Sequence, residues 1–336
     1  MRRLLPLLGS VLLALSTACG IGAPPSPPPT PTSLKPASLQ TPRPALPATP
    51  TPPPASTATV TLRTMVPATQ TPVPSVRGTP VSASEPLQGL LLDDTLLSPI
   101  IGEGFPYRVY LPPDYLQKPQ QHYPVLYMLH GAGGNYTEWS DSFLPEQADR
   151  MMAAHDIPPL IIVMPEDSGQ TYWANWSQGG PRWADYVTVD LVSTIDQRYR
   201  TLPNAASRAI GGLSMGGLGA LNLAFQHPDV FGVVGAHSPS VRVDPDPTLW
   251  FLDGQTFWDN NPIWLVENRP DLGGLKIWLD AGDEDIWLPN IEAVHTALVD
   301  HGLQPVWHVF NGPHEAVYWI EHVPDYLRFY GEALKT

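Results

Sequence analysis

The sequence predicts an α/β domain with a mostly parallel central sheet and helices on both faces. Short apolar runs alternate with segments that carry apolar residues at helical spacing, which is the order of β–α–β units. The last 250 of the 336 residues are enough for one such domain with a sizeable core. Because ligand sites of parallel sheets gather at the carboxyl ends of the strands, candidate functional residues are sought there.

The expected elements follow one another along residues 87–336. Apolar runs bounded by turn residues predict strands at 107–111, 124–129, 160–164, 207–213, 231–234, 275–279 and 306–310. Apolar residues at helical spacing predict helices at 186–199, 218–227, 291–301 and 316–330. Residues 239–271 are rich in Pro and Trp without a clear period, and we expect them to form an insertion arching over the site.

Residues 1–19 read as an export signal, with Arg2 and Arg3 before an apolar run from Leu4 to Leu15. The only cysteine, Cys19, follows that run and resembles the acylated cysteine of a bacterial lipoprotein, although Ser16 stands where Leu is usual. This predicts an exported protein, anchored at the cell surface through Cys19 or, with ordinary cleavage after Ala18, secreted. A single cysteine also excludes an internal disulfide and a multi-cysteine zinc site.

Composition separates residues 20–86 from the rest of the chain. Between Ile21 and Pro86, 38 of 66 residues are Pro, Ser or Thr, which predicts a disordered linker that would act as a spacer. The net charge of the whole chain is −14, and residues 1–86 contribute a positive share, so residues 87–336 carry −19. Such an acidic domain repels phosphate backbones, and we expect no nucleic-acid partner.

A candidate nucleophile lies in the pattern G-x-S-x-G, from Gly212 to Gly216, between an expected strand and an expected helix. Glycines on both sides permit a tight turn that projects the Ser214 hydroxyl over the sheet edge. The start of the following helix favours developing negative charge there. The alternative is a structural glycine-rich turn.

A nucleophilic serine needs a base and an acid that orients the base. Of the histidines after Ser214, we favour His314, because it follows the last expected strand. The other six fall on helices, inside strands or nearer the serine: His227, His237, His295, His301, His308 and His322. Four carboxylates follow the preceding strand, Asp280, Asp283, Glu284 and Asp285. Asp285 is the choice, and Asp283 is the runner-up.

Two backbone amides are expected to form an oxyanion hole, that of Met215 after the nucleophile and that of Ala132 in a glycine-rich loop. A plain turn would also explain those loop glycines. Aromatic residues after the strands could line a substrate pocket: Trp139, Trp173, Trp176 and Trp183, with His237 as a further lining residue. Core packing is the alternative for each of them.

The motifs together resemble the esterase D-like family of α/β-hydrolases, which includes feruloyl and acetylxylan esterases, S-formylglutathione hydrolases and mycolyltransferases. The resemblance runs from about Ser98 to Tyr330 and includes His130-Gly131, Gly212–Gly217, Asp280-x-Gly282-x-x-Asp285 and Gly312-Pro313-His314. Pro313 departs from the Gly that many relatives have. The resemblance implies that Asp285 is the acid and that Ala132 is the second oxyanion donor.

The resemblance further implies a serine esterase that needs no metal and no cofactor. Its expected partner is a small-molecule or carbohydrate ester, with a membrane contact only through the lipid anchor. Two alternatives remain open, because one fold and one triad serve many acyl groups. One is an acyltransferase with the same triad, and the other is a surface binding protein on a hydrolase scaffold.

Overall fold

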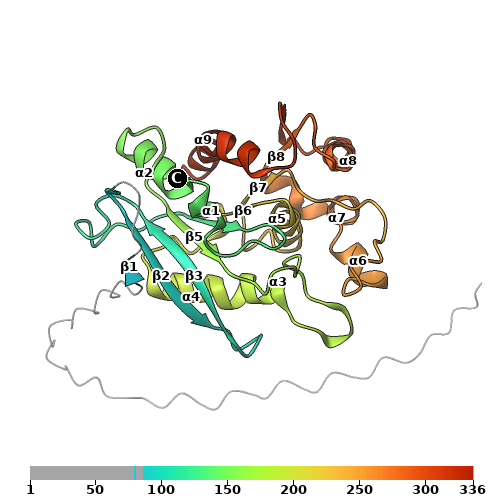
Figure 1. The fold of residues 1–336 in the computed structure, drawn as a ribbon, viewed down its shortest axis with the longest axis horizontal. Helices are drawn as coiled ribbons and strands as arrows, with labels where there is room; N and C mark the ends of the chain where they lie inside the picture. Colours follow the sequence, from blue (N-terminus) through green and yellow to red (C-terminus); the bar gives the residue numbers. More distant parts are fainter. Residues whose placement is uncertain (1–78, 81–85, 336) are drawn as a thin grey trace, which may run out of the picture. The chain divides into compact units, whose positions relative to one another are not determined.

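The computed structural model describes residues 79–80 and 86–335 (Figure 1). The predicted export signal and Cys19 lie outside the described residues, as does most of the expected linker 20–86. Within that linker, Thr79–Pro80 form a two-residue strand, β1, which pairs with Leu92 and Asp93. No helix in the described part of the chain is long and apolar enough to cross a bilayer.

A nine-stranded sheet runs through these residues in the order β1-β2-β3-β5-β4-β6-β7-β8-β9. Its longer strands are β2 (Leu90–Leu97), β3 (Gly104–Leu111), β4 (Val125–Leu129), β5 (Ile161–Pro165), β6 (Arg208–Leu213), β7 (Val233–His237), β8 (Lys276–Gly282) and β9 (Val306–Phe310). From β5 to β9 the neighbours pair in parallel, and the first four strands of the order pair antiparallel. The fold is therefore the α/β-hydrolase fold, as the sequence predicts.

Two apolar clusters cover the two faces of this sheet. Alternate residues of β4 enter one cluster or the other, as the pleat of a strand buried on both faces requires. One cluster contains α4 (Val192–Arg198), α5 (Met215–Gln226) and α8 (Leu288–Asp300). The other contains α1 (Glu138–Asp141), α2 (Leu144–Ala153) and α9 (Ala316–Ala333). Figure 1 shows α2 and α9 on one side of the sheet and α4 on the other.

Several elements differ from the sequence-based expectations. The strand β2 is not among the expected ones, because its sequence LLLDDTLL lacks alternation, yet it pairs with β3 along its whole length. The expected helix 186–199 is continuous in space but begins with a π-helical turn, Tyr186–Leu191, next to the short α3 (Trp183–Asp185). The segment 239–271 contains two helices, α6 (Gly254–Asp259) and α7 (Pro262–Asn268).

Short one-turn helices complete the described fold. They are η1 (Ser177–Gly179), η3 (Ala205–Ser207) and η4 (Pro270–Gly274). The strands β4, β6, β7, β8 and β9 all end at one edge of the sheet, because they run in parallel. The loops that follow them hold the candidate site residues, in agreement with the general rule for such sheets.

Candidate active site

Ser214 lies at the turn between β6 and α5. Its backbone has φ 52° and ψ −115°, a conformation that side chains other than glycine rarely adopt and that clusters at functional sites. A Cβ atom at position 216 would lie 2.4 Å from the Leu129 carbonyl oxygen, so only glycine lets the helix start so close to β4. The turn therefore brings a half-buried Ser214 hydroxyl to the strand ends.

His314 and Asp285 complete a hydrogen-bonded chain with Ser214. The loop between β9 and α9 carries His314, whose Nε2 lies 2.8 Å from Ser214 Oγ. His314 Nδ1 lies 3.0 Å from Asp285 Oδ2, in the loop after β8. The structure thus brings together the three residues that the sequence singles out as nucleophile, base and acid.

The environment of Asp285 favours its ionised form. Burial of this carboxyl would raise its pKa, but hydrogen bonds from His314, Ser238 and the Trp287 amide outweigh burial and lower the pKa below its ordinary value. Its Oδ1 accepts from the Trp287 amide at 2.7 Å. The charge therefore persists at neutral pH beside the imidazole, where it can stabilise an imidazolium.

The competing carboxylates make other contacts. Asp283 is exposed and accepts from the Gly312 amide at 2.9 Å, so it holds the loop that carries His314. Asp280 is fully buried and accepts from His237 Nδ1 at 2.8 Å. The remaining histidines lie on other elements, where His295 stacks on Trp307 and His308 stacks on Phe310.

The two expected oxyanion donors lie at the start of α5 and in the loop after β4. Met215 is the first residue of α5, where a backbone N–H has no carbonyl partner within the helix. Ala132 lies in the exposed loop after β4, and a Cβ atom at the adjacent Gly131 would come 3.6 Å from Ser214 Cβ. Among residues 86–335 the Ala132 amide donates to no protein acceptor, whereas Gly131 and Gly133 donate to Glu138 and Gly169. The oxyanion role of both amides stays a prediction.

The expected substrate pocket needs correction at four of its five residues. Trp139, Trp173, Trp183 and His237 are buried, with at most 2% of each residue exposed, and belong to the core. Trp139 Nε1 donates to the Leu129 carbonyl at 2.9 Å, and Trp173 Nε1 donates to the His130 carbonyl at 3.3 Å. A substrate cannot reach side chains packed in this way.

Trp176 is the member of that set that keeps partial exposure. Its ring stacks on Phe251 with 4.6 Å between centroids, and Trp250 meets it edge-on at 5.5 Å. Trp250 is 69% exposed, and its loop contacts the Trp176 loop through the hydrogen bond from the Ser177 amide to the Phe251 carbonyl. Sequence reasoning missed Trp250 because the segment 239–271 has no periodic pattern.

Ser238 is a second residue that sequence reasoning missed. It directly follows β7, and its hydroxyl donates to Asp285 Oδ2, the oxygen that also contacts His314. The signal that could have found it is its position at the carboxyl end of a parallel strand, next to the histidine considered for the pocket.

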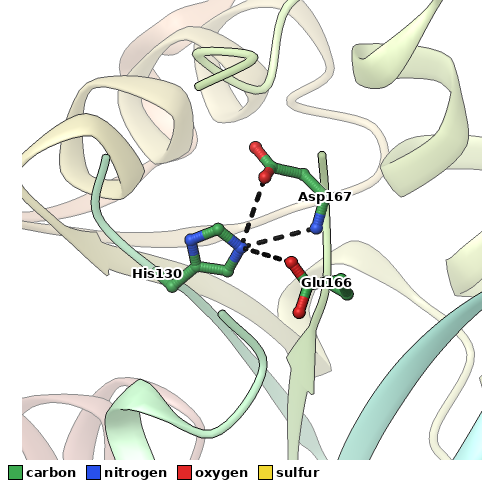
Figure 2. Close-up of side chains that lie close together, drawn as sticks. All are labelled: His130, Glu166 and Asp167. Atoms are coloured by element: carbon green, nitrogen blue, oxygen red, sulfur yellow. Dashed lines mark hydrogen bonds and ion pairs between the residues drawn. The ribbon is translucent and has the colours of Figure 1, made fainter. Parts of the chain in front are cut away.

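A cluster of His130, Glu166 and Asp167 lies where the loops after β4 and β5 begin (Figure 2). His130 Nε2 is 3.4 Å from Asp167 Oδ1 and 3.6 Å from Glu166 Oε1, and their ligand-type atoms lie within 4.8 Å of one another. Burial opposes a charge on His130, but the hydrogen bond to Glu166 and the charge of Asp167 raise its pKa. Nδ1 donates to the Gly131 carbonyl at 2.9 Å, so in the neutral ring Nε2 is free to accept from the Asp167 backbone amide at 3.4 Å. In the protonated ring the Nε2 proton faces the two carboxylates instead.

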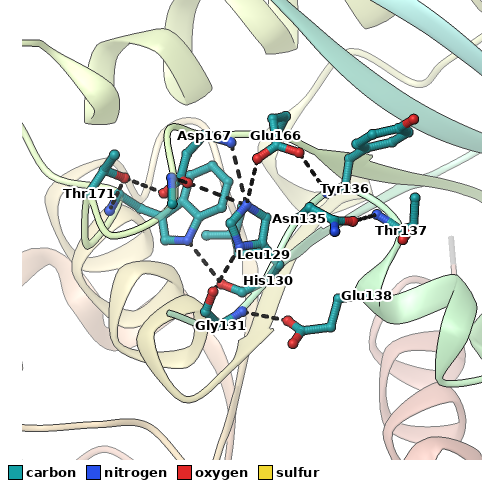
Figure 3. A network of polar contacts seen from close by, with 12 residues as sticks. Leu129, His130, Gly131, Asn135, Tyr136, Thr137, Glu138, Glu166, Asp167 and Thr171 are labelled. Atoms are coloured by element: carbon teal, nitrogen blue, oxygen red, sulfur yellow. Dashed lines mark hydrogen bonds and ion pairs between the residues drawn. The ribbon is translucent and has the colours of Figure 1, made fainter. Parts of the chain in front are cut away.

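Donors from the surrounding loops complete this network (Figure 3). Asp167 accepts from the Gly169 amide and the Thr171 hydroxyl. Glu166 Oε2 accepts from the Tyr136 amide at 3.0 Å. The His130 cluster thus joins the loop that contains Ala132 to the loop after β5.

Comparisons with known proteins find esterases among the proteins that are similar to this chain. A family model described as "Putative esterase" matches residues 98–330. The chain is 35% identical to Esterase Rv1288 of Mycobacterium tuberculosis over 133 residues, which are 39% of this chain and 28% of that protein. It is 34% identical to an endo-1,4-beta-xylanase/feruloyl esterase of Xylanibacter ruminicola over 164 residues, 44% of this chain and 22% of that protein. The chain thus spans less than a third of the length of either curated relative.

A solved structure named ferulic acid esterase extends the comparison to three dimensions. It superposes with a TM-score of 0.68 at 28% sequence identity and covers 74% of this chain and 100% of its own. The two proteins therefore share a fold over 74% of this chain and the full length of that protein.

Proposed function

The chain belongs to the Esterase family, and we propose on that premise that it is a serine carboxylic-ester hydrolase. The observation that carries the proposal is the hydrogen-bonded chain Ser214–His314–Asp285 at the carboxyl edge of the sheet. This arrangement is the one that activates a serine hydroxyl on several unrelated folds.

The proposed reaction follows from these contacts. His314 Nε2 accepts the Ser214 proton while Oγ forms a bond to the ester carbonyl carbon. The amides of Met215 and Ala132 donate to the resulting oxyanion. When the tetrahedral intermediate collapses, the C–O bond to the alcohol breaks, and His314 returns the proton to the departing alkoxide. Asp285 holds the tautomer that keeps Nε2 free to act as base.

Hydrolysis of the acyl-enzyme completes the cycle. A water molecule gives its proton to His314 Nε2 and bonds to the acyl carbon. The second tetrahedral intermediate then releases the carboxylic acid, and Ser214 Oγ recovers its proton from His314. Every step uses protons and electron pairs that the ester, the water and these residues supply.

We propose carbohydrate or aromatic acyl esters as substrates. Trp176 is partly exposed and lies beside the highly exposed Trp250. Their aromatic rings could pack against a planar acyl group or a sugar ring. Two of the similar proteins are named as a feruloyl esterase and a ferulic acid esterase. A hydrolysis screen over acetyl, butyryl, long-chain, feruloyl and acetyl-xylan esters tests this substrate class.

A fluorophosphonate probe tests the catalytic proposal directly. We expect covalent labelling at Ser214 and turnover of at least one ester, both lost in Ser214→Ala. Ser193→Ala, at an exposed serine of α4, is the matched control and should retain both. Undiminished ester turnover by a folded Ser214→Ala variant would contradict the hydrolase mechanism.

A further inference from the structure

Ser238 has an unusual backbone for a residue that is not glycine. It follows the last residue of β7, is fully buried, and has a φ of 53°. Its amide donates to the Asp280 carbonyl at 3.0 Å, which fixes it against β8. Strained residues of this kind persist where the surrounding structure imposes them, and they gather at functional sites.

The Ser238 side chain reaches both the acid and the base of the candidate site. Its hydroxyl donates to Asp285 Oδ2, and its oxygen lies 3.3 Å from His314 Nδ1. A hydroxyl has one proton to donate and two lone pairs to accept with. Because the proton goes to the carboxylate, a lone pair is left to face the N–H of the imidazole. The three side chains therefore close a ring of contacts.

The backbone around Ser238 also contacts the nucleophile. The Ser214 amide donates to the His237 carbonyl at 3.0 Å, and the Ser240 amide donates to the Ser214 carbonyl at 3.0 Å. The segment that carries the Ser238 hydroxyl is thus fixed to the serine, the histidine and the aspartate at once. A displacement of this segment would change the geometry of all three.

We propose that Ser238 is a positioning residue that holds the Asp285 carboxylate and the His314 ring in their reactive arrangement. The inference rests on the proposed function, and Ser238 itself touches neither the substrate nor the reacting atoms. The hydroxyl orients Oδ2 toward His314 Nδ1 and helps to keep the buried carboxylate ionised. Without it, a rotation of Asp285 would leave the imidazolium formed during the reaction poorly paired.

Ser238→Gly is the sharpest test of this role, because glycine adopts a positive φ readily and only the hydroxymethyl group is lost. Hydrogen bonds to charged groups are strong enough that we expect kcat to fall about 10- to 100-fold, with KM within about threefold of the wild type. Fluorophosphonate labelling of Ser214 should slow by a similar factor. A kcat within about twofold of the wild type would overturn the proposal.

Ser207→Ala is the matched control from another loop. Ser207 is also buried, but it precedes β6, at the end of that strand opposite Ser214. We expect near wild-type kcat for this variant. If Ser238→Gly fails to fold, as judged by circular dichroism and thermal unfolding, Ser238→Ala removes the same hydroxyl and provides the same comparison.

A double-mutant cycle with Asp285→Asn separates positioning from a general structural role. If Ser238 acts through the Asp285 carboxylate, Ser238→Gly should lower kcat less than about threefold in the Asp285→Asn background. Equal losses in both backgrounds would overturn the proposal. Retained turnover in Ser214→Ala would contradict the hydrolase mechanism instead, so the two failures are distinguishable.

Discussion

At the scale of single residues, Asp283 and Asp285 illustrate how two neighbouring carboxylates acquire different tasks. Asp283 projects into solvent and accepts from the Gly312 amide and the Asn311 side chain, and those hydrogen bonds lower its pKa. Asp285 turns inward and contacts His314. The first shapes the histidine loop, and the second is placed to act on the imidazole.

Substitution by Asn at the two positions should separate these tasks. In serine proteases, loss of the acid's charge lowers kcat by about 10⁴, because the histidine takes the wrong tautomer. We expect Asp285→Asn to lower kcat by about 10²–10⁴ and Asp283→Asn by less than about tenfold. Steady-state kinetics on folded variants measures both. A large loss of kcat in Asp283→Asn, together with near wild-type kcat in Asp285→Asn, would show that the acid is misassigned.

His130 provides a pH-dependent prediction at the same scale. Its pKa is raised above the ordinary value of about 6.5, so the stabilising contacts of its protonated form are fully present below pH 6.5. They are lost as the pH rises through the higher folded pKa. The substitution His130→Gln should therefore lower the free energy of unfolding by more at pH 6 than at pH 8.5.

Denaturant unfolding at the two pH values measures this difference. His122→Gln is the control, because His122 is exposed and lies outside the His130 cluster. Its effect should be small at both pH values. A loss for His130→Gln that stays constant or grows with pH would contradict the charged network.

Single residues also show which parts of the candidate site could be predicted from the sequence and which could not. Ser214 and His314 could be singled out because a glycine-rich turn and a position after the last strand have meaning without coordinates. Ser238 could not, because its role depends on a positive φ and on the distance between two loops. The prediction that the buried tryptophans line the pocket was wrong for a related reason. Sequence order alone does not distinguish a core position after a strand from a position in a pocket wall.

At the scale of elements, Asp280 ties β7, β8 and α9 together. It accepts hydrogen bonds from four groups, which we call the Asp280 network: His237 Nδ1, Trp278 Nε1, Tyr318 OH and Tyr326 OH. Burial, together with the charge of Asp280, raises the pKa of Tyr318 and Tyr326, so both phenols stay protonated and donate. Tyr330 adds a hydrogen bond to His237 Nε2 at 2.9 Å.

The close approach of α9 to the sheet depends on glycine. A Cβ atom at position 235 would lie 2.0 Å from the Tyr330 hydroxyl, so Gly235 in β7 leaves the space that lets this hydroxyl reach His237. Because His314 lies just before α9 and Ser238 just after β7, the Asp280 network supports both sides of the candidate site.

Asp280→Asn should therefore destabilise the fold more than it changes the chemistry. An amide cannot accept from four donors, and hydrogen bonds to a buried charge are among the stronger ones, so we expect a loss of about 2–4 kcal/mol in the free energy of unfolding. Chemical denaturation measures it. Asp300→Asn on the exposed end of α8 is the control and should change little. A near wild-type stability of Asp280→Asn would contradict the structural importance of the network.

The parallel strands could be predicted from sequence because strands buried on both faces read as short apolar runs. The strand 306–310 is confirmed residue for residue, and the others differ by a few residues at their ends. The strand β2 could not be predicted, because its Asp93 finds a partner in Arg108 of β3 at 2.7 Å only after pairing. The helix α5 starts three residues earlier than predicted, since its glycines hide the helical pattern.

At the scale of the whole molecule, the acidic net charge of residues 87–336 favours the approach of some classes of substrate over others. A domain with a net charge of −19 repels polyanions, whereas neutral acyl esters and uncharged sugars approach without that penalty. The proposed substrates are of this neutral kind. The export signal expected at residues 1–19 would place the enzyme outside the cytoplasm.

We propose that Cys19 anchors the exported protein through an acyl chain. The apolar run Leu4–Leu15 and the small residues before the cysteine support this proposal. Expressed as the full chain in a bacterium that processes lipoproteins, the wild type should fractionate with membranes and carry a lipid-modified N-terminus by mass spectrometry. The Cys19→Ser variant should either leave the membrane fraction or keep its signal segment uncleaved. Its kcat on a soluble ester should be unchanged, because Cys19 is 195 residues before Ser214 in the sequence. A Ser16→Leu variant, which restores the usual lipoprotein residue, is the matched control and should remain in the membrane fraction. An unmodified mature N-terminus in the wild type, or a soluble secreted form, would contradict the anchor and leave the proposed esterase chemistry intact.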